Sequence, residues 1–292
     1  MTSQQQPGTS IAAALAEATQ LLRAGGHGDA RRDAATLLMH TLNCDRAFLI
    51  THMEDALAPD ALAQFRLSVE RRAQGEPLQY VTGRQEFYGL MFEVTPDVLI
   101  PRPETELLVE SALKLLRATH APQLCDVGTG SGCIPVALLH ERADARAIGL
   151  DISPAALAVA ARNAARHHVA DRLQLIVSDC FAALDATTIN FDLILSNPPY
   201  VAESDLIGLQ REVRDFEPRV ALTPGGDGLS IIRRLLADAP RLLKSGGHLL
   251  FEIGFNQHEA VARLIDSSVW TLLDVHQDLQ GIPRTVALRR AA

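Results

Sequence analysis

The sequence predicts an α/β protein with a doubly wound, mostly parallel sheet, preceded by a small all-α domain and a β-hairpin linker. Residues 1–80 carry apolar side chains at helical spacing, and residues 81–100 are rich in strand-forming and aromatic residues. From residue 101 to the end, short apolar runs alternate with helical stretches, which is typical of parallel sheets with crossover helices. We therefore expect a helical domain over 1–80, a hairpin linker over 81–100 and a sheet domain over 101–292.

The amino-terminal region has the pattern of several short amphipathic helices. The apolar positions that share one face of the first helix are Ile11, Leu15, Ala18 and Leu22. The glycines within 25–28 end that helix, because glycine favours helix termination. Residues 31–42 and 59–72 show similar periodicity, and the Gly-Glu-Pro sequence at 75–77 breaks the last helix.

The linker reads as a hairpin that turns at Gly89-Leu90. Aromatic residues gather here, and they are Tyr80, Phe87, Tyr88 and Phe92. One interpretation is a small core beneath the hairpin. The other is a lip that joins the domains and touches a substrate.

The sheet domain contains apolar runs of strand length, bounded by turn residues. These runs are 124–127, 147–150, 173–177, 193–195 and 248–253. Helical stretches separate most of them, notably 153–167 and 229–243. Two late strands near Thr271 and Thr285 would complete a seven-stranded sheet, with an antiparallel edge as one arrangement.

A glycine-rich turn follows the first of these strands and opens a helix. Its candidate ligand-binding residues are Gly128, Thr129, Gly130, Ser131 and Gly132. Glycines allow a tight turn and close backbone approach, and the helix amino terminus faces the ligand. The Gly-x-Gly-x-Gly spacing differs from the dinucleotide pattern Gly-x-Gly-x-x-Gly, which weighs against NAD.

Acidic residues follow the second and third strands. Asp151 can accept hydrogen bonds from both hydroxyls of a ribose, or it can cap the next helix. Ser153, with Pro154 at the first helical position, fits the cap better and leaves Asp151 for a ligand. Asp179, next to Cys180, is a candidate acceptor for an adenine amino group.

The sequence Asn197-Pro198-Pro199-Tyr200 follows the fourth strand, at the edge where open α/β sheets bind ligands. The two prolines stiffen the loop and donate no N–H, so its carbonyl oxygens remain free acceptors. Asn197 adds a side-chain carbonyl, and Tyr200 adds an aromatic wall with a polar tip. Two acceptors and a flat wall suit a planar amino group. Alone, the tetrapeptide would also be compatible with an ordinary loop.

Composition limits the classes of function. The net charge is −8, which argues against a protein that grips a nucleic-acid backbone directly. No amino-terminal signal sequence and no apolar run near ~20 residues is evident, so we expect a soluble, cytoplasmic protein without a membrane partner. The cysteines, expected to be reduced thiols, are Cys44, Cys125, Cys133 and Cys180. They have no Cys-x-x-Cys spacing, so no metal site is expected. Sequence does not indicate an oligomeric state, and we take a monomer as the default expectation.

The order of these features along one sheet edge is similar to that of S-adenosylmethionine-dependent methyltransferases that act on planar amino groups. Within that group the chain resembles the release-factor glutamine methyltransferases. The segments that carry the resemblance are 77–83, 86–90, 98–106, 216–222 and 278–284. The match covers about residue 75 to the end, with a weaker match across the helical domain.

The resemblance implies methyl transfer from S-adenosylmethionine to the glutamine amide nitrogen in the Gly-Gly-Gln motif of class I peptide chain release factors. It implies that Gly128 to Gly132 and Asp151 hold the cofactor, with Asp179, Cys180 and Asn197 beside it. The tetrapeptide 197–200 would receive the glutamine, and Asn197, Pro198 and Tyr200 would be its catalytic residues. The helical domain would recognise the protein substrate.

The chain departs from the family pattern at Cys180, where an aromatic residue is frequent, and Phe181 follows it. At this position the side chain that would pack against adenine therefore differs from the family pattern. Arg102 and Glu104 would lie at the ligand edge by the same analogy.

Three alternatives remain at this point. An adenine-specific DNA or RNA amino-methyltransferase needs the same acceptors and aromatic wall, but it must flip a base and hold a polyanion. A methyltransferase-like binding subunit would be expected to lose the glycines, Asp151 or Asn197, which this chain retains. A dehydrogenase is disfavoured by the glycine spacing.

Overall fold

The computed structural model describes residues 8–187 and 190–291. By its internal contacts the chain divides into two compact units. The first comprises Met1–Gly83 together with Arg211–Phe216, and the second comprises Arg84–Gln210 together with Glu217–Ala292.

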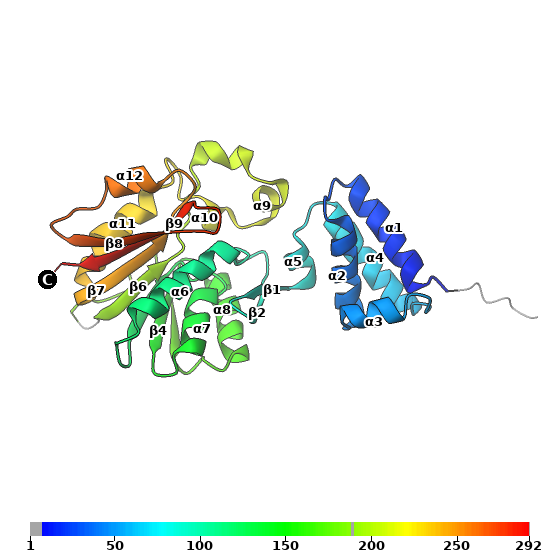
Figure 1. The fold of residues 1–292 in the computed structure, drawn as a ribbon, viewed down its shortest axis with the longest axis horizontal. Coiled ribbons are helices and arrows are strands. Elements are labelled where there is room, and N and C mark those ends of the chain that lie inside the picture. Colours follow the sequence, from blue (N-terminus) through cyan, green and yellow to red (C-terminus); the bar gives the residue numbers. More distant parts are fainter. Residues whose placement is uncertain (1–7, 188–189, 292) are drawn as a thin grey trace, which may run out of the picture. The chain divides into compact units, whose positions relative to one another are not determined.

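The first unit is helical. Its helices are α1 (Ile11–Ala24), α2 (Ala30–Leu42), α3 (Arg46–Thr51), α4 (Pro59–Ala73), α5 (Leu78–Thr82) and α9 (Arg211–Phe216). The Ser10 side chain accepts from the Ala13 N–H and so begins α1, and Pro59 begins α4. Helices α1, α2 and α4 pack side by side (Figure 1) around the fully buried Leu22, Leu37 and Phe65.

A buried ion pair links three helices of this unit. Arg72 of α4 donates from Nε to Asp33 of α2 at 2.8 Å and from Nη1 to Glu212 of α9 at 2.6 Å. Burying an arginine is costly unless its charge is paired, and here two carboxylates pair it. This pairing ties a short segment from far along the chain, α9, to the helical unit.

The hairpin comprises β1 (Arg84–Phe87) and β2 (Leu90–Glu93), which pair antiparallel around Tyr88 and Gly89. Both turn residues have positive φ, at 52° and 70°, as a two-residue hairpin turn of this hand requires. Phe87 and Phe92 are fully buried in the core of the second unit, with ring centroids 6.1 Å apart. Their burial favours the interpretation as a small core. Helix α5 continues through Thr82, two residues into the range predicted for the linker.

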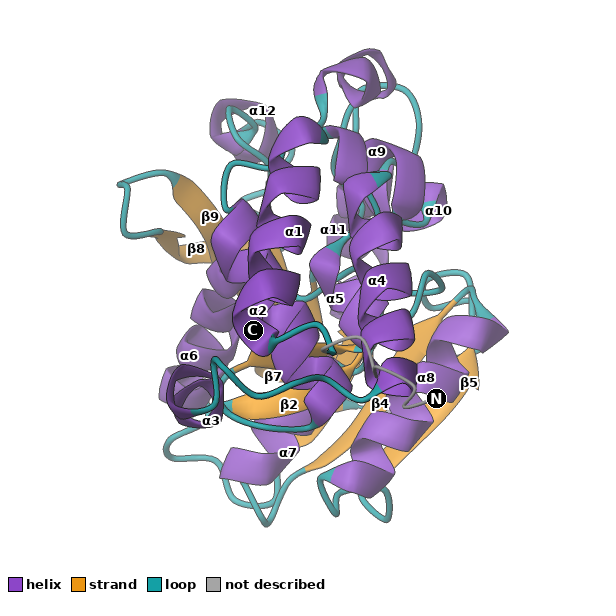
Figure 2. Cartoon of the chain, turned by 90° about the vertical axis from the view of Figure 1, so that its right-hand side faces the viewer, coloured by secondary structure: helices purple, strands orange, loops and turns teal. Residues whose placement is uncertain are grey.

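The second unit is built on a seven-stranded sheet with strand order β5-β4-β3-β6-β7-β9-β8. Figure 2 shows β4, β5, β7, β8 and β9 among its strands. Its strands are β3 (Gln123–Val127), β4 (Arg146–Asp151), β5 (Leu173–Val177), β6 (Phe191–Ser196), β7 (Leu243–Glu252), β8 (Trp270–Gln277) and β9 (Pro283–Arg290). Strands β3 to β7 are parallel, and β9 runs antiparallel to both β7 and β8. The predicted α/β fold class, including the seven strands and the late antiparallel pairing, is confirmed.

Helices cover both faces of the sheet. They are α6 (Glu106–Leu115), α7 (Cys133–Glu141), α8 (Pro154–Arg166), α10 (Arg219–Leu222), α11 (Ser230–Asp238) and α12 (His258–Ala262), with 3₁₀ turns η1 (Pro103–Thr105), η2 (Glu203–Gly208) and η3 (Ala239–Arg241). Helices α6, α7 and α8 share one core, and α11 and α12 share the other (Figure 1). Alternate strand residues enter alternate cores: Leu193 packs with the first and Ile194 with the second.

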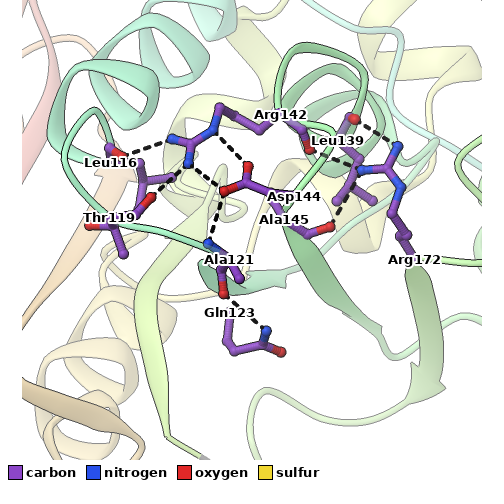
Figure 3. Close-up of polar contacts among 9 residues, drawn as sticks. All are labelled: Leu116, Thr119, Ala121, Gln123, Leu139, Arg142, Asp144, Ala145 and Arg172. Atoms are coloured by element: carbon purple, nitrogen blue, oxygen red, sulfur yellow. Dashed lines mark hydrogen bonds and ion pairs between the residues drawn. The ribbon is translucent and has the colours of Figure 1, made fainter.

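Two arginines organise the edge where the parallel strands begin (Figure 3). Arg142 donates to the carbonyl oxygens of Leu116 and Thr119 at 2.8 and 2.7 Å, just after α6. Arg172 donates to the carbonyl oxygens of Leu139 and Arg142, both at 2.9 Å, at the end of α7. These bonds add a charged donor to carbonyl groups at and after the helix ends, two of which, those of Leu116 and Arg142, also accept a backbone N–H. The loops that form the site lie at the opposite ends of these strands.

Candidate active site

A cavity of about 440 Å³ opens at the carboxyl ends of β3, β4, β5 and β6. This volume lies in the range of small-molecule sites, and the position is the one where open α/β sheets bind ligands. The predicted site residues that line it are Gly128, Thr129, Gly130, Ser131, Asp151, Asp179, Cys180, Asn197, Pro198 and Pro199. Further walls come from Thr105 and from some of the residues within 97–101, 218–224 and 230–234.

The glycine loop needs its glycines for two reasons. Gly128, Gly130 and Gly132 have φ of 76°, 52° and 77°, a region that side chains disfavour. At Gly132, which begins α7, an added Cβ would also lie 3.0 Å from the Cβ of Ala160. The loop therefore presents bare backbone to the cavity at the amino end of α7.

Asp151 holds this loop in place. Its Oδ2 accepts from the Gly130 N–H at 2.8 Å, and its Oδ1 accepts from the Ser153 N–H at 2.9 Å. Ser153 caps α8 by accepting from the Ala156 N–H, as the sequence indicated. Each carboxylate oxygen retains a second lone pair, which suits the two hydroxyls of a ribose. Burial raises the pKa of Asp151 above its usual value.

Asp126, at the end of β3, lies beneath the loop. Its Oδ2 accepts from the Thr129 hydroxyl at 2.6 Å, while its buried Oδ1 has no hydrogen-bond partner in the part of the chain that the structure describes. Burial raises the pKa of Asp126 to about 7, although the Thr129 hydrogen bond lowers it. Two carboxylates under one loop suit a ligand that carries positive charge.

Asp179 is paired with an arginine that sequence did not indicate. Arg234 of α11 donates to Asp179 Oδ1 at 2.7 Å and to its backbone oxygen at 3.1 Å. One carboxylate oxygen therefore remains for another donor. Cys180 lines the cavity next to it, while Phe181 is buried in the core and not in the cavity wall. Ile152 and Ile231 supply apolar surface to the same cavity, which suits the faces of an adenine ring.

The Asn-Pro-Pro-Tyr loop is fixed from several sides. The Val201 N–H donates to the Leu222 oxygen at 3.0 Å, and the Gln257 amide donates to the Tyr200 oxygen at 2.8 Å. Asn197, Pro198 and Pro199 line the cavity. The Tyr200 hydroxyl donates to Glu252 at 3.2 Å, so the polar tip of the ring faces β7. Burial beside this carboxylate raises the pKa of Tyr200.

Two buried polar residues that sequence analysis did not identify adjoin this loop. The Thr105 hydroxyl donates to Glu252 Oε2 at 2.7 Å, and the Asn197 amide nitrogen donates to Thr105 Oγ1 at 3.0 Å. Burial raises the pKa of Glu252 to about 7, and its hydrogen bonds to Thr105 and Tyr200 lower it. Glu252 lies within the apolar run 248–253. A carboxylate in such a run is the sequence feature that could have identified it as a buried functional residue.

Arg102 forms an ion pair that joins two segments of the chain. It donates to Glu217 Oε1, a carboxylate whose other oxygen accepts from the Ile100 N–H at 3.3 Å. This contact joins the segment before η1 to the segment before α10, and both segments border the cavity. Glu104 lies near enough to Glu252 for its charge to raise the pKa of that residue.

Comparison with known proteins assigns the family. A model of the PrmC N-terminal domain matches residues 13–83, and a model of the methyltransferase small domain matches residues 103–215. A release factor glutamine methyltransferase from Cereibacter sphaeroides is 47% identical over 279 residues, which cover 96% of this chain and 98% of that protein. The chain belongs to the release factor glutamine methyltransferases. A second member, from Koribacter versatilis, is 44% identical and covers 95% of this chain and 97% of its own length.

Membership of the release factor glutamine methyltransferase family confirms the resemblance, the enzyme class and the cofactor. The chain is an S-adenosylmethionine-dependent methyltransferase. Its glycine loop, paired carboxylates and apolar cavity wall fit that cofactor, which has a ribose, an adenine and positive charge.

Solved structures share the fold at low identity. The hMettl16 catalytic domain in complex with a MAT2A 3′UTR hairpin has a TM-score of 0.54 at 14% identity, over 83% of this chain and 84% of that chain. A methyltransferase from Pyrococcus furiosus has a TM-score of 0.50 at 14% identity, over 80% of this chain and 100% of that chain. These likenesses concern the fold alone. Within the described residues no helix has the length and apolar character that a membrane span needs.

Proposed function

We propose that this enzyme transfers a methyl group from S-adenosylmethionine to the side-chain amide nitrogen of glutamine in the Gly-Gly-Gln motif of class I peptide chain release factors. The printed name of the relatives, release factor glutamine methyltransferase, supports this substrate. The observation that carries the proposal is Asn197-Pro198 in the wall of the cavity that begins at the glycine loop. An acceptor for a planar amide thus shares one cavity with the site for a methyl donor.

An amide nitrogen is a poor nucleophile because its lone pair is delocalised into the carbonyl. In our proposal the two N–H groups of the substrate amide donate hydrogen bonds, one to the Asn197 side-chain oxygen and one to the Pro198 carbonyl oxygen. The nitrogen lone pair then faces the sulfonium methyl. Positioning of this kind can contribute roughly 7–11 kcal/mol in favourable cases. The substrate nitrogen would bond to the methyl group as the carbon–sulfur bond breaks, and the methylated, charged nitrogen would then release an N–H proton to water.

Gly128, Thr129, Gly130, Ser131 and Asp151, which line the cavity, would hold the cofactor, with Asp179, Cys180 and Asn197 beside it. Gly132 would contribute as the residue that joins the loop to α7. Tyr200 would shape the substrate site from the Glu252 side, supported by its hydroxyl contact. The helical domain, assigned to residues 1–80, would recognise the release factor, and the linker 81–100 and methyltransferase domain 101–292 would follow it. We propose a cytoplasmic monomer with no direct nucleic-acid partner, consistent with the net charge of −8.

The test is mass spectrometry of a purified class I release factor after incubation with the enzyme and S-adenosylmethionine. We expect one added methyl on the glutamine of the Gly-Gly-Gln loop. Asn197→Ala should lower the rate at least about 100-fold while binding of S-adenosylhomocysteine by calorimetry persists, because a transition-state acceptor is lost. The matched control is Asn190→Ala, an exposed asparagine just before β6, which should leave the rate unchanged.

Absence of methylation with intact cofactor binding would contradict the substrate assignment. Methylation of a DNA or RNA adenine in its place would identify the alternative enzyme class.

A further inference from the structure

Two side chains, Thr105 and Glu252, connect Asn197 to Tyr200 through the protein interior by three hydrogen bonds. Asn197 Nδ2 donates to Thr105 Oγ1 at 3.0 Å, Thr105 donates to Glu252 Oε2 at 2.7 Å, and Tyr200 donates to Glu252 Oε1 at 3.2 Å. Thr105 ends η1 and Glu252 ends β7, so three segments far apart in sequence meet here. Both Thr105 and Glu252 are 2% exposed. Thr105 borders the cavity, whereas Glu252 is not among the lining residues, so Glu252 has no ready water partner.

The chemistry of these groups fixes the direction of each hydrogen bond. An ionised carboxylate only accepts, and a threonine hydroxyl has one proton to donate. Once that proton points at Glu252, the Thr105 oxygen can only accept. It must therefore face the nitrogen of the Asn197 side chain and not its oxygen.

We propose that Thr105 and Glu252 are positioning residues that set the Asn197 amide, so that its oxygen faces the substrate amide. This inference rests on the proposed function and deepens it, since it names what makes the site selective for an –NH2 group. Asn197 lines the cavity, and its Oδ1 has no hydrogen bond to the described residues. That oxygen is therefore free to accept from a substrate.

Orientation matters because the two ends of an amide are nearly the same size. A reversed Asn197 would present its own –NH2 to the –NH2 of the substrate, and two donors would face each other. Sites that leave a substrate polar group unpaired discriminate strongly against it. A reversed amide would suit a carboxylate instead, such as a glutamate in place of the glutamine.

The ionisation of Glu252 decides the pH at which the proposal is tested. Arg284 lowers the pKa of Glu252 and Glu104 raises it, but burial dominates and brings the pKa to about 7. Measurements at pH 8.5 therefore keep Glu252 ionised, and the direction of the hydrogen bonds holds under those conditions.

The experiment compares Thr105→Val with Thr105→Ser at pH 8.5. Valine keeps the shape but removes the hydroxyl, so we expect kcat on the release factor to fall about 10- to 100-fold, since a lost buried partner costs about 1–3 kcal/mol. KM and S-adenosylhomocysteine affinity should stay within about twofold. Serine keeps the hydroxyl and should restore kcat to within about threefold of the wild type.

A second pair addresses Glu252. Glutamine can still accept from Thr105 and donate to Tyr200, so Glu252→Gln should retain most of kcat. Methionine is of similar length without an acceptor, so Glu252→Met frees the Thr105 proton to face the Asn197 oxygen and should reproduce the loss seen in Thr105→Val. A release factor with Gly-Gly-Glu in place of Gly-Gly-Gln serves as an inhibitor, and its affinity is expressed relative to that of the Gly-Gly-Gln factor. This relative affinity should be about tenfold higher for Thr105→Val than for the wild type.

Exchange of the Asn197 side-chain amide protons, followed by NMR, measures the orientation without any substrate. The wild type and Thr105→Ser should show a protected proton, and Thr105→Val should exchange at least about tenfold faster. A kcat of Thr105→Val within twofold of the wild type, or equal loss in Glu252→Gln and Glu252→Met while both remain folded, would overturn the proposal. Failure of the wild type to methylate the release factor would count against the proposed function, while the exchange measurement would still decide the orientation.

Discussion

Asp151 shows how one side chain can serve the fold and the ligand together. Its two oxygens accept from the Gly130 and Ser153 backbone N–H groups, so it ties the glycine loop to the start of α8. In Asp151→Asn the amide nitrogen must face one of these N–H groups, and two donors then oppose each other. We expect affinity for S-adenosylhomocysteine to fall about 10- to 100-fold, since such a mismatch costs about 1–3 kcal/mol. Isothermal titration calorimetry measures the change.

The control is Asp185→Asn, an exposed carboxylate near the end of the β5–β6 connection, which should bind the ligand as the wild type does. If Asp151→Asn kept full affinity, the assignment of Asp151 to the cofactor would be wrong.

The loop and strand-end residues named from the sequence, apart from Gly132 and Tyr200, line one cavity, because the carboxyl ends of parallel strands meet at one edge. Sequence analysis did not identify the residues, distant along the chain, that form hydrogen bonds with these side chains. Thr105 reaches Asn197 across 92 positions, and Arg234 reaches Asp179 across 55. Neither residue has local features that distinguish it from an ordinary helix-start threonine or surface arginine. Such contacts depend on tertiary packing, which periodicity does not encode.

At the scale of elements, the Asn-Pro-Pro-Tyr loop depends on close packing against the loop before α11. An added Cβ at Gly228 would lie 2.2 Å from the Tyr200 oxygen and 3.0 Å from the Ala202 nitrogen, both backbone atoms. Gly228→Ala should therefore displace residues 200–202. We expect a destabilisation of about 1–3 kcal/mol beyond the cost of its positive φ, and at least about tenfold lower activity.

Gly226→Ala is the matched control, because Gly226 has φ of 56° but nothing within 4 Å of an added Cβ. Both variants carry the strain of an alanine at positive φ, so the difference between them isolates the collision. Chemical denaturation and the methylation assay measure it. Equal stability and equal activity of the two variants would show that the loop tolerates the displacement.

The arginine pair at the other edge of the sheet (Figure 3) serves the fold and not the site. Arg172 donates to the carbonyl oxygens of Leu139 and Arg142, both at 2.9 Å, at the end of α7. Arg172→Ala should destabilise the protein by about 1–3 kcal/mol, because both carbonyl groups lose the guanidinium donor and the Arg142 carbonyl keeps only the Ala145 N–H. Affinity for S-adenosylhomocysteine should not change. Denaturation and calorimetry on the same samples test both statements.

Arg146→Ala is the control for this edge, since exposed Arg146 makes one 3.4 Å bond to the Asp171 oxygen. It should cost no more than about 0.5 kcal/mol. A loss of cofactor affinity in Arg172→Ala would mean that the two edges of the sheet are coupled.

For the whole molecule, alternating apolar runs and helices were enough to predict a doubly wound sheet, because each run must be buried on both faces. The same pattern could not assign α9 to the helical unit. In the structure α9 belongs to that unit, and its Glu212 pairs with the buried Arg72 across 140 positions. A single surface-type glutamate in a charged segment gives no indication of such a partner.

Stability of the whole protein should depend on pH through its buried carboxylates. Burial raises the pKa of Asp126 from 3.8 to about 7. A raised folded-state pKa means that the folded protein holds the proton more tightly than the unfolded chain does. The stability from this group is therefore complete below about pH 4 and is lost as pH rises through about 7.

Asp126→Asn removes this titration while it keeps an acceptor for Thr129. Each pKa unit corresponds to about 1.4 kcal/mol, so between pH 5 and pH 8 the wild type should lose roughly 2 kcal/mol more than the variant. Denaturant unfolding at the two pH values gives the difference, and the histidines, which also titrate, cancel because both proteins share them. Parallel pH profiles for the two proteins would mean that Asp126 stays ionised in the folded state. The orphaned Oδ1 beneath the glycine loop would then carry a permanent negative charge toward the cationic cofactor.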